Sequence, residues 1–140
     1  RKQIIYDKSN LKIINDSKST SFSATNGLLS TYKNIYWIVG GIFKKGDKFI
    51  LKKKFFKNIK AYIIGTNKNY FVKQFKNKIN FQYSKNIENA LFTIKKEIRN
   101  DTNNKLILFS PAAASFDQFK NFEHRGNYFN KLIKKIDIYE

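Results

Sequence analysis

Three polar segments of the chain carry the residue types that bind anions. Residues 15–20 read NDSKST, residues 40–47 read GGIFKKGD, and residues 110–122 read SPAAASFDQFKNF. Lysine ammonium groups and hydroxyl groups bind carboxylates and phosphates, and small residues let the backbone approach a ligand closely. Each segment follows an apolar run. If those runs are parallel strands, the segments meet at one edge of a sheet, where ligands bind in such folds. The alternative is that ordinary solvated loops happen to lie together.

The signatures of a complete catalyst are missing from the sequence. It contains no GxGxxG dinucleotide motif, no GxxxxGK[ST] phosphate loop and no cysteine. His124 is the single histidine, and we interpret it as a residue that caps or packs near the start of a helix. Metal-ligand residues do not cluster along the sequence. We therefore expect no catalytic residue and no metal site in this chain.

Hydrophobic runs and turn signals predict alternating strands and helices. Short runs at 3–6 and 11–15, separated by the turn composition DKSN, predict a hairpin. The other predicted elements are a helix at 21–32, a strand at 35–39, a helix with Leu51, Phe55 and Ile59 on one face, a strand at 61–64, a helix at 68–77, a strand at 79–83, a helix capped by Asn86 with apolar positions from Ile87 to Ile98, a strand at 105–109 and a helix at 123–136.

The apolar character of the predicted strands indicates the fold class. Strands that are apolar throughout, such as IYWIV at 35–39, are typical of a parallel sheet covered on both faces. The sequence therefore predicts one α/β domain with a three-layer, Rossmann-like arrangement. Its mostly parallel sheet should have about six strands and an antiparallel edge hairpin.

The high positive charge raises the alternative of a basic nucleic-acid-binding module. The chain has 140 residues and a formal net charge of +18. However, arginine occurs only at positions 1, 99 and 125, and the lysines are scattered along the chain, whereas proteins that read bases rely on arginine. Lysine, isoleucine, asparagine and phenylalanine dominate together, as codon bias in an AT-rich genome produces. We therefore expect no specific nucleic-acid partner.

Further features of the composition bear on processing and location. Methionine is absent even at position 1, so we expect a piece cut from a longer protein. No apolar run approaches the roughly 20 residues of a membrane helix, so we expect no membrane partner. The absence of cysteine and of a signal peptide fits a cytoplasmic location. We expect a monomer.

The polar segments also form motifs with a characteristic order and spacing. These are NDSKST at 15–20, WIVGG followed by Lys44, SPAAASFDQF at 110–119 and NFEHRG at 121–126. With them the chain resembles, over nearly its whole length, the C-terminal domain of the Mur ligases, and within that family the D-glutamate-adding branch. The last motif is long and specific, and the NDSK loop separates this branch from its relatives.

The resemblance implies one domain of a three-domain cytoplasmic enzyme of peptidoglycan precursor synthesis. Residues 1–140 would be the C-terminal domain, which brings the amino acid and closes over ATP. The absent N-terminal domain would hold the UDP-sugar, and the absent central domain most of the ATP and Mg²⁺. The implied reaction is phosphorylation of UDP-N-acetylmuramoyl-L-alanine by ATP to an acyl phosphate, which the amine of D-glutamate then attacks. The domain alone is expected to be inactive.

The resemblance also implies substrate-binding roles for individual residues. Arg1 would lie near the phosphates of ATP and Asp16 near its ribose. The residues implied for D-glutamate are Lys18, Thr20 and Lys44 at its α-carboxylate, and Ser115 with the backbone of Phe122 at its side-chain carboxylate. A dianionic amino acid requires such cationic, hydroxyl and amide donors from several loops.

The chain departs from the family pattern at three positions. Ser21 stands where asparagine is usual, Ala113 where cysteine is common, and Phe43 where many members have glycine or aspartate. Because Lys45 is adjacent to Lys44, the choice between the two lysines stays open. Another Mur enzyme or a folylpolyglutamate-type ligase domain is the alternative within the same fold.

Overall fold

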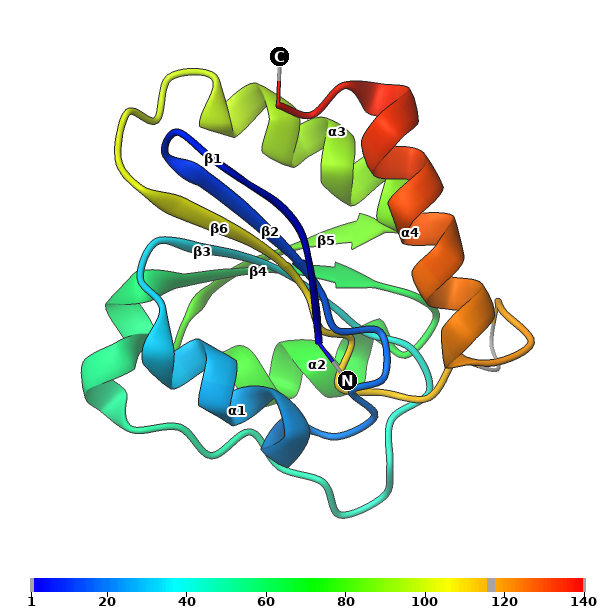
Figure 1. The fold of residues 1–140 in the computed structure, drawn as a ribbon. Helices are drawn as coiled ribbons and strands as arrows, with labels where there is room; N and C mark the ends of the chain where they lie inside the picture. Colours follow the sequence, from blue (N-terminus) through cyan, green and yellow to red (C-terminus); the bar gives the residue numbers. More distant parts are fainter. Residues whose placement is uncertain (1, 116–117, 140) are drawn as a thin grey trace.

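The computed structural model describes residues 2–115 and 118–139, which form one six-stranded sheet flanked by helices (Figure 1). The strands are arranged in the order β1-β2-β6-β3-β4-β5. The elements are β1 (Gln3–Lys8), β2 (Leu11–Asn15), α1 (Phe22–Thr31), β3 (Ile35–Val39), the 3₁₀-helix η1 (Lys53–Asn58), β4 (Ile59–Ile64), α2 (Lys68–Phe75), β5 (Asn80–Lys85), α3 (Ile87–Ile98), β6 (Lys105–Phe109) and α4 (Phe122–Ile136).

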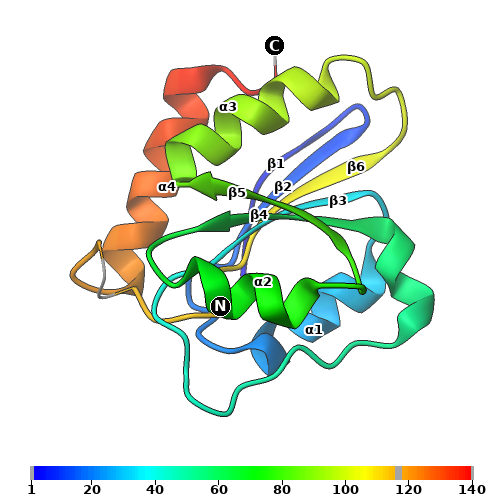
Figure 2. The same ribbon diagram turned by 180° about the vertical axis from the view of Figure 1, so that it is seen from behind.

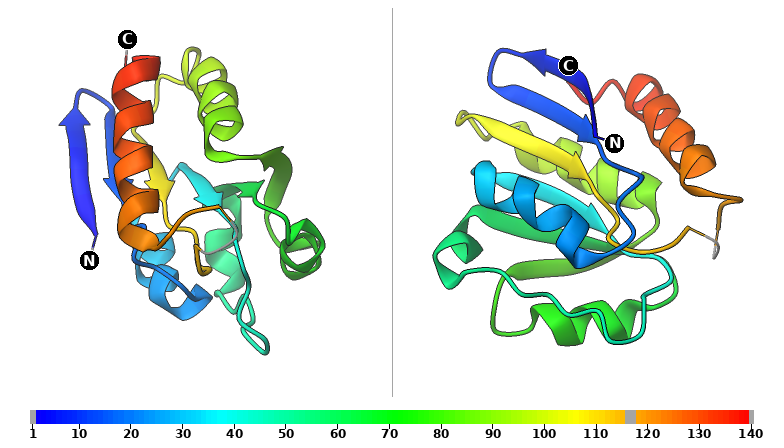
Figure 3. Two further views of the ribbon diagram at one scale, coloured as in Figure 1. Left: turned by 90° about the vertical axis from the view of Figure 1, so that its right-hand side faces the viewer. Right: turned by 60° about the horizontal axis from the view of Figure 1, so that its bottom comes forward.

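The sheet has the predicted mixture of parallel and antiparallel pairs. β1 and β2 form an antiparallel hairpin, and β1 is the outer strand at one edge (Figure 3). The other four neighbouring pairs are parallel. The α/β, Rossmann-like prediction with an antiparallel edge hairpin is therefore confirmed.

Helices cover both faces of the sheet, which explains why its inner strands are apolar throughout. α1 and α2 lie on one face, and α3 and α4 on the other (Figures 1 and 2). Side chains alternate along a strand. In β3, Trp37 packs toward α1 and α2, whereas Ile38 packs toward α3 and α4. Both side chains are fully buried, so neither face of this strand accepts a polar residue.

An aromatic cluster stabilises the face that carries α1 and α2. The Phe75 ring centroid lies 5.3 Å from that of Trp37 and 5.1 Å from that of Phe49. Phe22, in the first turn of α1, contacts the same rings. Aromatic pairs of this geometry contribute about 0.5–1.5 kcal/mol each beyond the burial of their area. The cluster therefore fixes α1 and α2 against the middle of the sheet.

Asparagine and serine side chains begin three of the helices. Asn86 accepts the Asn89 N–H at 2.7 Å, which confirms the predicted cap of α3. Ser21 caps α1 through Ala24, although at the longer distance of 3.3 Å. Such caps satisfy N–H groups that the first helical turn leaves without a backbone acceptor.

Among the described residues, none of the helices has both the length and the apolar character required to cross a membrane.

The predicted helix through Leu51, Phe55 and Ile59 is wrong. Residues 53–58 form a short 3₁₀-helix with no buried residue, and Ile59 already belongs to β4, where it pairs with Ile35. Helical spacing was misleading here because Ile59 is buried as part of the sheet, while Leu51 packs beside the core from an irregular segment. Tertiary contacts decided this stretch against its local pattern.

Candidate functional site

Three loops leave the carboxyl ends of three neighbouring strands. We name them the β2 loop (residues 16–21), the β3 loop (residues 40–52) and the β6 loop (residues 110–121). Because β6 lies between β2 and β3, the loops start side by side at the same edge of the sheet (Figure 1). This is the edge at which ligands bind in open parallel sheets. The predicted meeting of the three polar segments is confirmed.

Backbone hydrogen bonds join the β6 loop to both of its neighbours. The N–H of Asp16 donates to the last carbonyl of β6 at 2.6 Å, and the N–H of Gly40 donates to the carbonyl of Pro111 at 2.9 Å. Further out, Ile42 and Ala114 exchange a pair of hydrogen bonds of 3.0 and 2.9 Å. The loops therefore form one connected layer above the strands.

Two glycines at the start of the β3 loop allow this close approach. A Cβ added at Gly40 would lie 2.1 Å from the carbonyl oxygen of Ile64, and one at Gly41 would lie 2.5 Å from that of Ala114. Their φ angles of +136° and +142° are also values that side chains disfavour. Glycine is required at both positions for steric and conformational reasons.

Asp16 lies at the end of a buried chain of hydroxyl groups. Ser110 Oγ donates to its carboxylate at 2.8 Å, and Ser110 Oγ is 2.7 Å from Thr25 Oγ1. Thr25 Oγ1 in turn is 2.6 Å from Ser19 Oγ. Trp37 Nε1 also donates to the Ser110 carbonyl at 2.7 Å, which fixes the backbone of Ser110. The network couples Asp16, predicted for the ribose of ATP, to the segment that carries Lys18 and Thr20.

Burial makes the Asp16 carboxyl a source of pH-dependent stability. Desolvation raises the pKa of Asp16 above its ordinary value, although the hydrogen bond from Ser110 and the charge of Lys2 act in the opposite direction. Between the ordinary pKa of 3.8 and this raised pKa, the folded state binds more protons than the unfolded state. The free energy of unfolding therefore falls as the pH rises through that window, and the loss is complete above it.

Replacing Asp16 by asparagine should remove this dependence. The amide oxygen of Asp16→Asn still accepts from Ser110, but it carries no charge to desolvate. We expect the variant to be at least as stable as the parent chain at pH 7, and to show a flatter stability profile from pH 4 to 7 in urea denaturation. A parent chain that gains stability over the variant as the pH rises would show that the folded state favours the ionised carboxylate.

Arg125 holds the β2 and β6 loops to α4, a role that sequence reasoning missed. Its side chain is only 2% exposed. Nε donates to Ser17 Oγ at 3.1 Å, Nη2 to the Ser17 carbonyl at 2.6 Å, and Nη1 to the Ala113 carbonyl at 2.9 Å. Ser17 Oγ in turn donates to the Phe122 carbonyl at 2.7 Å, which links the β2 loop to the start of α4. One signal was available: Arg125 lies four residues before Phe129, on the inward face of α4.

A small pocket lies where the β2 loop meets the first turns of α4. Asn15 Nδ2 donates to the Gly126 carbonyl at 2.9 Å and to Asn130 Oδ1 at 2.8 Å, which holds the helix against the end of β2. The pocket has a volume of about 250 Å³, and both Lys18 and Phe122 line it. A helix N-terminus favours negative charge. Lys18 and the helix end therefore favour an anion here, whereas Glu123, which also lines the pocket, disfavours one.

The departure at Phe43 has a structural explanation. Its ring stacks on Tyr70 with a centroid distance of 4.1 Å, and its N–H donates to Asn67 Oδ1 at 3.2 Å. These contacts anchor the β3 loop beside α2. At the other end of the turn, the N–H of Asp47 donates to the Lys44 carbonyl at 2.9 Å. Lys44 is therefore held in an ordered turn, with its side chain exposed.

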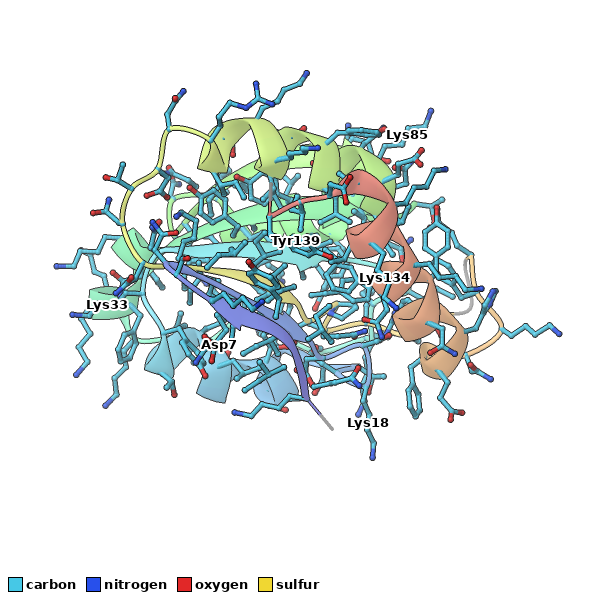
Figure 4. All side chains as sticks on the ribbon, turned by 45° about the horizontal axis from the view of Figure 1, so that its top comes forward. Asp7, Lys18, Lys33, Lys85, Lys134 and Tyr139 are labelled. Carbon is cyan, nitrogen blue, oxygen red and sulfur yellow. The ribbon has the colours of Figure 1, made fainter. Side chains whose placement is uncertain are left out.

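The structure unites only some of the residues predicted for D-glutamate. Lys18 and Phe122 line one pocket, while Thr20, Lys44 and Ser115 do not line it. Lys18, Thr20 and Lys44 are exposed, and the Lys18 side chain extends away from the ribbon in Figure 4. Ser115 is only 3% exposed and accepts the Phe119 N–H at its carbonyl. The five residues come from the three joined loops and the start of α4.

Two further expectations concern single residues. Arg1, predicted for the phosphates of ATP, lies outside the described residues. His124 Nδ1 accepts the Lys120 N–H at 3.2 Å, and its ring contacts Phe119 edge to face. The interpretation of His124 as a packing residue near a helix start is confirmed.

Within residues 2–115 and 118–139, no three side chains of the histidine, cysteine, aspartate and glutamate types gather as a metal site would require.

Comparison with known proteins supports the resemblance inferred from the motifs. No protein-family model matches the chain. It is 37% identical over 136 residues to the UDP-N-acetylmuramoylalanine–D-glutamate ligase of Wolbachia sp. subsp. Brugia malayi, covering 97% of this chain and 27% of that protein. The ligase of the same name from Rickettsia prowazekii is 40% identical, covering 96% and 31%. That of Fusobacterium nucleatum is 37% identical over 142 residues, covering 97% and 32%.

Each match covers nearly all of this chain but only part of the relative. The chain spans about three-tenths of the length of the curated relatives, while nearly all of its own residues are matched. A share of that size is what one domain of a larger enzyme occupies. Over nearly its whole length, this chain is homologous to a domain-sized segment of the UDP-N-acetylmuramoylalanine–D-glutamate ligases.

Proposed function

We propose that this chain is the C-terminal domain of a cytoplasmic, ATP-dependent ligase that adds D-glutamate to UDP-N-acetylmuramoyl-L-alanine. The observation that carries the proposal is the 37–40% identity to ligases of that name over nearly the whole chain. The shared edge of the β2, β3 and β6 loops supports it independently. Because the relatives quoted above share one name, this proposal is preferred to another Mur enzyme, a folylpolyglutamate-type ligase or a nucleic-acid-binding module.

The donor types at the loop edge fit a dianionic amino acid. Lys18, Thr20 and Lys44 present two ammonium groups and a hydroxyl group to solvent. We assign these three side chains to the α-carboxylate of D-glutamate. Ser115 and the backbone N–H of Phe122, at the start of α4, are assigned to its side-chain carboxylate. Charge-assisted hydrogen bonds from several directions orient the amine for attack, because both ends of the substrate are held.

The residues of this chain fit part of a nucleotide site. When bound, ATP supplies the phosphoryl group that activates the acceptor carboxylate. Asp16 offers a buried carboxylate of the kind that accepts hydrogen bonds from ribose hydroxyl groups, and the chain of Ser110, Thr25 and Ser19 keeps it in place. The described residues provide no gathered set of Mg²⁺ ligands. We therefore assign Mg²⁺ and most contacts to ATP to another domain of the ligase.

In the full ligase, replacing Lys44 by alanine should weaken the use of D-glutamate by about 10- to 150-fold. A hydrogen bond to a charged group is worth roughly 1.5–3 kcal/mol, which converts to that range. The effect should appear in the apparent constant for D-glutamate more than in those for ATP or the UDP-sugar. Steady-state kinetics with each substrate varied in turn measures it.

Lys45→Ala is the matched control for this experiment. Lys45 is adjacent, equally cationic and also exposed, so a general loss of positive charge would affect both variants alike. We expect Lys45→Ala to be nearly silent. If instead Lys45→Ala destroys the use of D-glutamate and Lys44→Ala does not, the carboxylate contact belongs to Lys45. If both variants retain normal kinetics, the β3 loop does not hold D-glutamate.

The 140-residue chain alone should form no amide and hydrolyse no ATP. A half-site cannot exclude water from the reacting groups, so its contacts to ATP stay weak. Incubation of the chain with ATP, Mg²⁺, D-glutamate and UDP-N-acetylmuramoyl-L-alanine, followed by phosphate release and product analysis, tests this. Turnover that persists in a preparation free of the intact ligase would show that the chain carries its own catalytic centre.

A further inference from the structure

A second pocket lies at the opposite end of the parallel strands from the β2, β3 and β6 loops. It has a volume of about 360 Å³ and is bounded by the turn of the β1-β2 hairpin, the end of α3 and the residues after α4. Its charged lining residues are four cations and one acid: Lys8, Lys95, Arg99, Lys105 and Asp101. The first residue of β6, Lys105, lines this pocket, whereas the last residue of that strand adjoins the β6 loop.

Lys105 is the unusual residue of the pocket. Only 6% of its surface is exposed, although lysine is among the residues least often buried. Alternation along β6 places its side chain on the same face as Ile107 and Phe109, toward α3. Within the described residues, its ammonium group makes no ion pair or side-chain hydrogen bond. The nitrogen is also not among the fully enclosed, unpartnered atoms, and Lys105 lines both this pocket and a neighbouring one beside the hairpin turn.

The single acid of the pocket is already occupied by other donors. Asp101 Oδ2 accepts from Tyr36 Oη at 2.5 Å and from Asn34 Nδ2 at 3.0 Å, and Oδ1 accepts from the Asn103 N–H at 3.0 Å. Burial raises the pKa of Asp101, but these hydrogen bonds and the charge of Lys105 outweigh it and lower the pKa below its ordinary value. Asp101 therefore offsets part of the Lys105 charge without bonding to it.

The remaining lining groups leave an excess of positive charge and a flat aromatic wall. Lys95 Nζ donates to the Ile136 carbonyl at 2.5 Å, which fixes one cation beside the pocket. Arg99 is exposed at the end of α3. Tyr6 and Tyr139 stack face to face with a centroid distance of 4.4 Å. A buried ammonium without a direct anion is costly, so an anionic ligand would stabilise this arrangement.

We propose that this pocket binds a small phosphate-bearing anion. Phosphate oxygens accept from ammonium and guanidinium groups together, and Lys105 with Arg99 supplies one of each. The site is separate from the proposed D-glutamate and ATP residues because it occupies the amino ends of the strands. Figure 4 labels Tyr139, which lines this pocket, and Lys18 of the β2 loop, and the two residues lie apart in that view. The proposal does not depend on the ligase activity.

Titration of the 140-residue chain with inorganic pyrophosphate tests the site. The amide signals of Thr102, Lys105 and Tyr139 should shift together in heteronuclear NMR spectra, and the same titration yields a dissociation constant. We expect Lys105→Gln to weaken binding at least tenfold at constant salt. Lys73→Gln, which removes one charge from the exposed face of α2, is the matched control and should change binding less than twofold.

Each outcome of the titration supports or overturns the proposed anion-binding pocket. Equal weakening by Lys105→Gln and Lys73→Gln would assign the binding to the overall charge of +18 and overturn the proposal. Shifts confined to the β2, β3 and β6 loops would also overturn it. If Lys105→Gln fails to fold in a thermal melt, Arg99→Gln replaces it, because Arg99 is exposed. That variant should weaken binding at least threefold, and normal binding by it would reject the pocket.

Discussion

Replacing Gly40 by alanine is expected to lower the free energy of unfolding by roughly 3 kcal/mol or more. The added Cβ would lie 2.1 Å from the Ile64 carbonyl oxygen, a backbone atom that cannot move aside cheaply. The φ angle of +136° adds conformational strain for any residue with a side chain. Urea denaturation at fixed pH, with the m-value compared to that of the parent chain, measures the loss.

The same substitution at Gly27 is the matched control. Gly27 lies in α1, is exposed, and an added Cβ would meet no atom within 4 Å. Alanine is favoured over glycine inside a helix by roughly 0.5–1 kcal/mol, so Gly27→Ala should raise the free energy of unfolding. The two variants should therefore change stability in opposite directions. A loss below about 1 kcal/mol for Gly40→Ala would mean that the β3 loop relaxes away from β4.

Replacing Arg125 by methionine should cost about 3–5 kcal/mol of stability. Methionine keeps much of the side-chain length but leaves the Ser17 and Ala113 carbonyls without the donors that now satisfy them. Arg125→Lys should recover part of the loss, because one ammonium group keeps the charge but cannot reach all three acceptors. Thermal and urea unfolding of both variants provides the comparison.

The Arg125 substitutions also test the link between stability and the candidate site. Lys131→Met, on the exposed face of α4, is the control and should stay within about 0.5 kcal/mol of the parent. In the full ligase, Arg125→Lys should weaken the use of D-glutamate, since Ser17, which donates to the Phe122 carbonyl, loses part of its own anchor. A stable Arg125→Met variant with normal kinetics would show that the loops keep their positions without the guanidinium group.

The sequence by itself determined the fold class and the loops that carry the site. Runs such as IYWIV in β3 are apolar at every position, and only a strand covered on both faces tolerates that pattern. Local signals were equally reliable at Asn86, because an N-cap depends on a residue and its neighbours three positions ahead. The motifs around Lys18, Lys44 and Ser115 were specific enough to predict the homologous ligases. The roles assigned to these residues stay predictions.

Only the tertiary structure decided how the site is held together. The sequence places Arg125 on the inward face of a helix, but it does not indicate the partner, Ser17, which lies 108 positions earlier in the chain. The placement of β6 between β2 and β3 brings Ser110 to Asp16, which makes a surface-type loop acid a buried one. Lys105 likewise begins a strand whose two faces are both covered. Partners so distant in sequence leave no local pattern, because the folded sheet alone brings them within hydrogen-bonding distance.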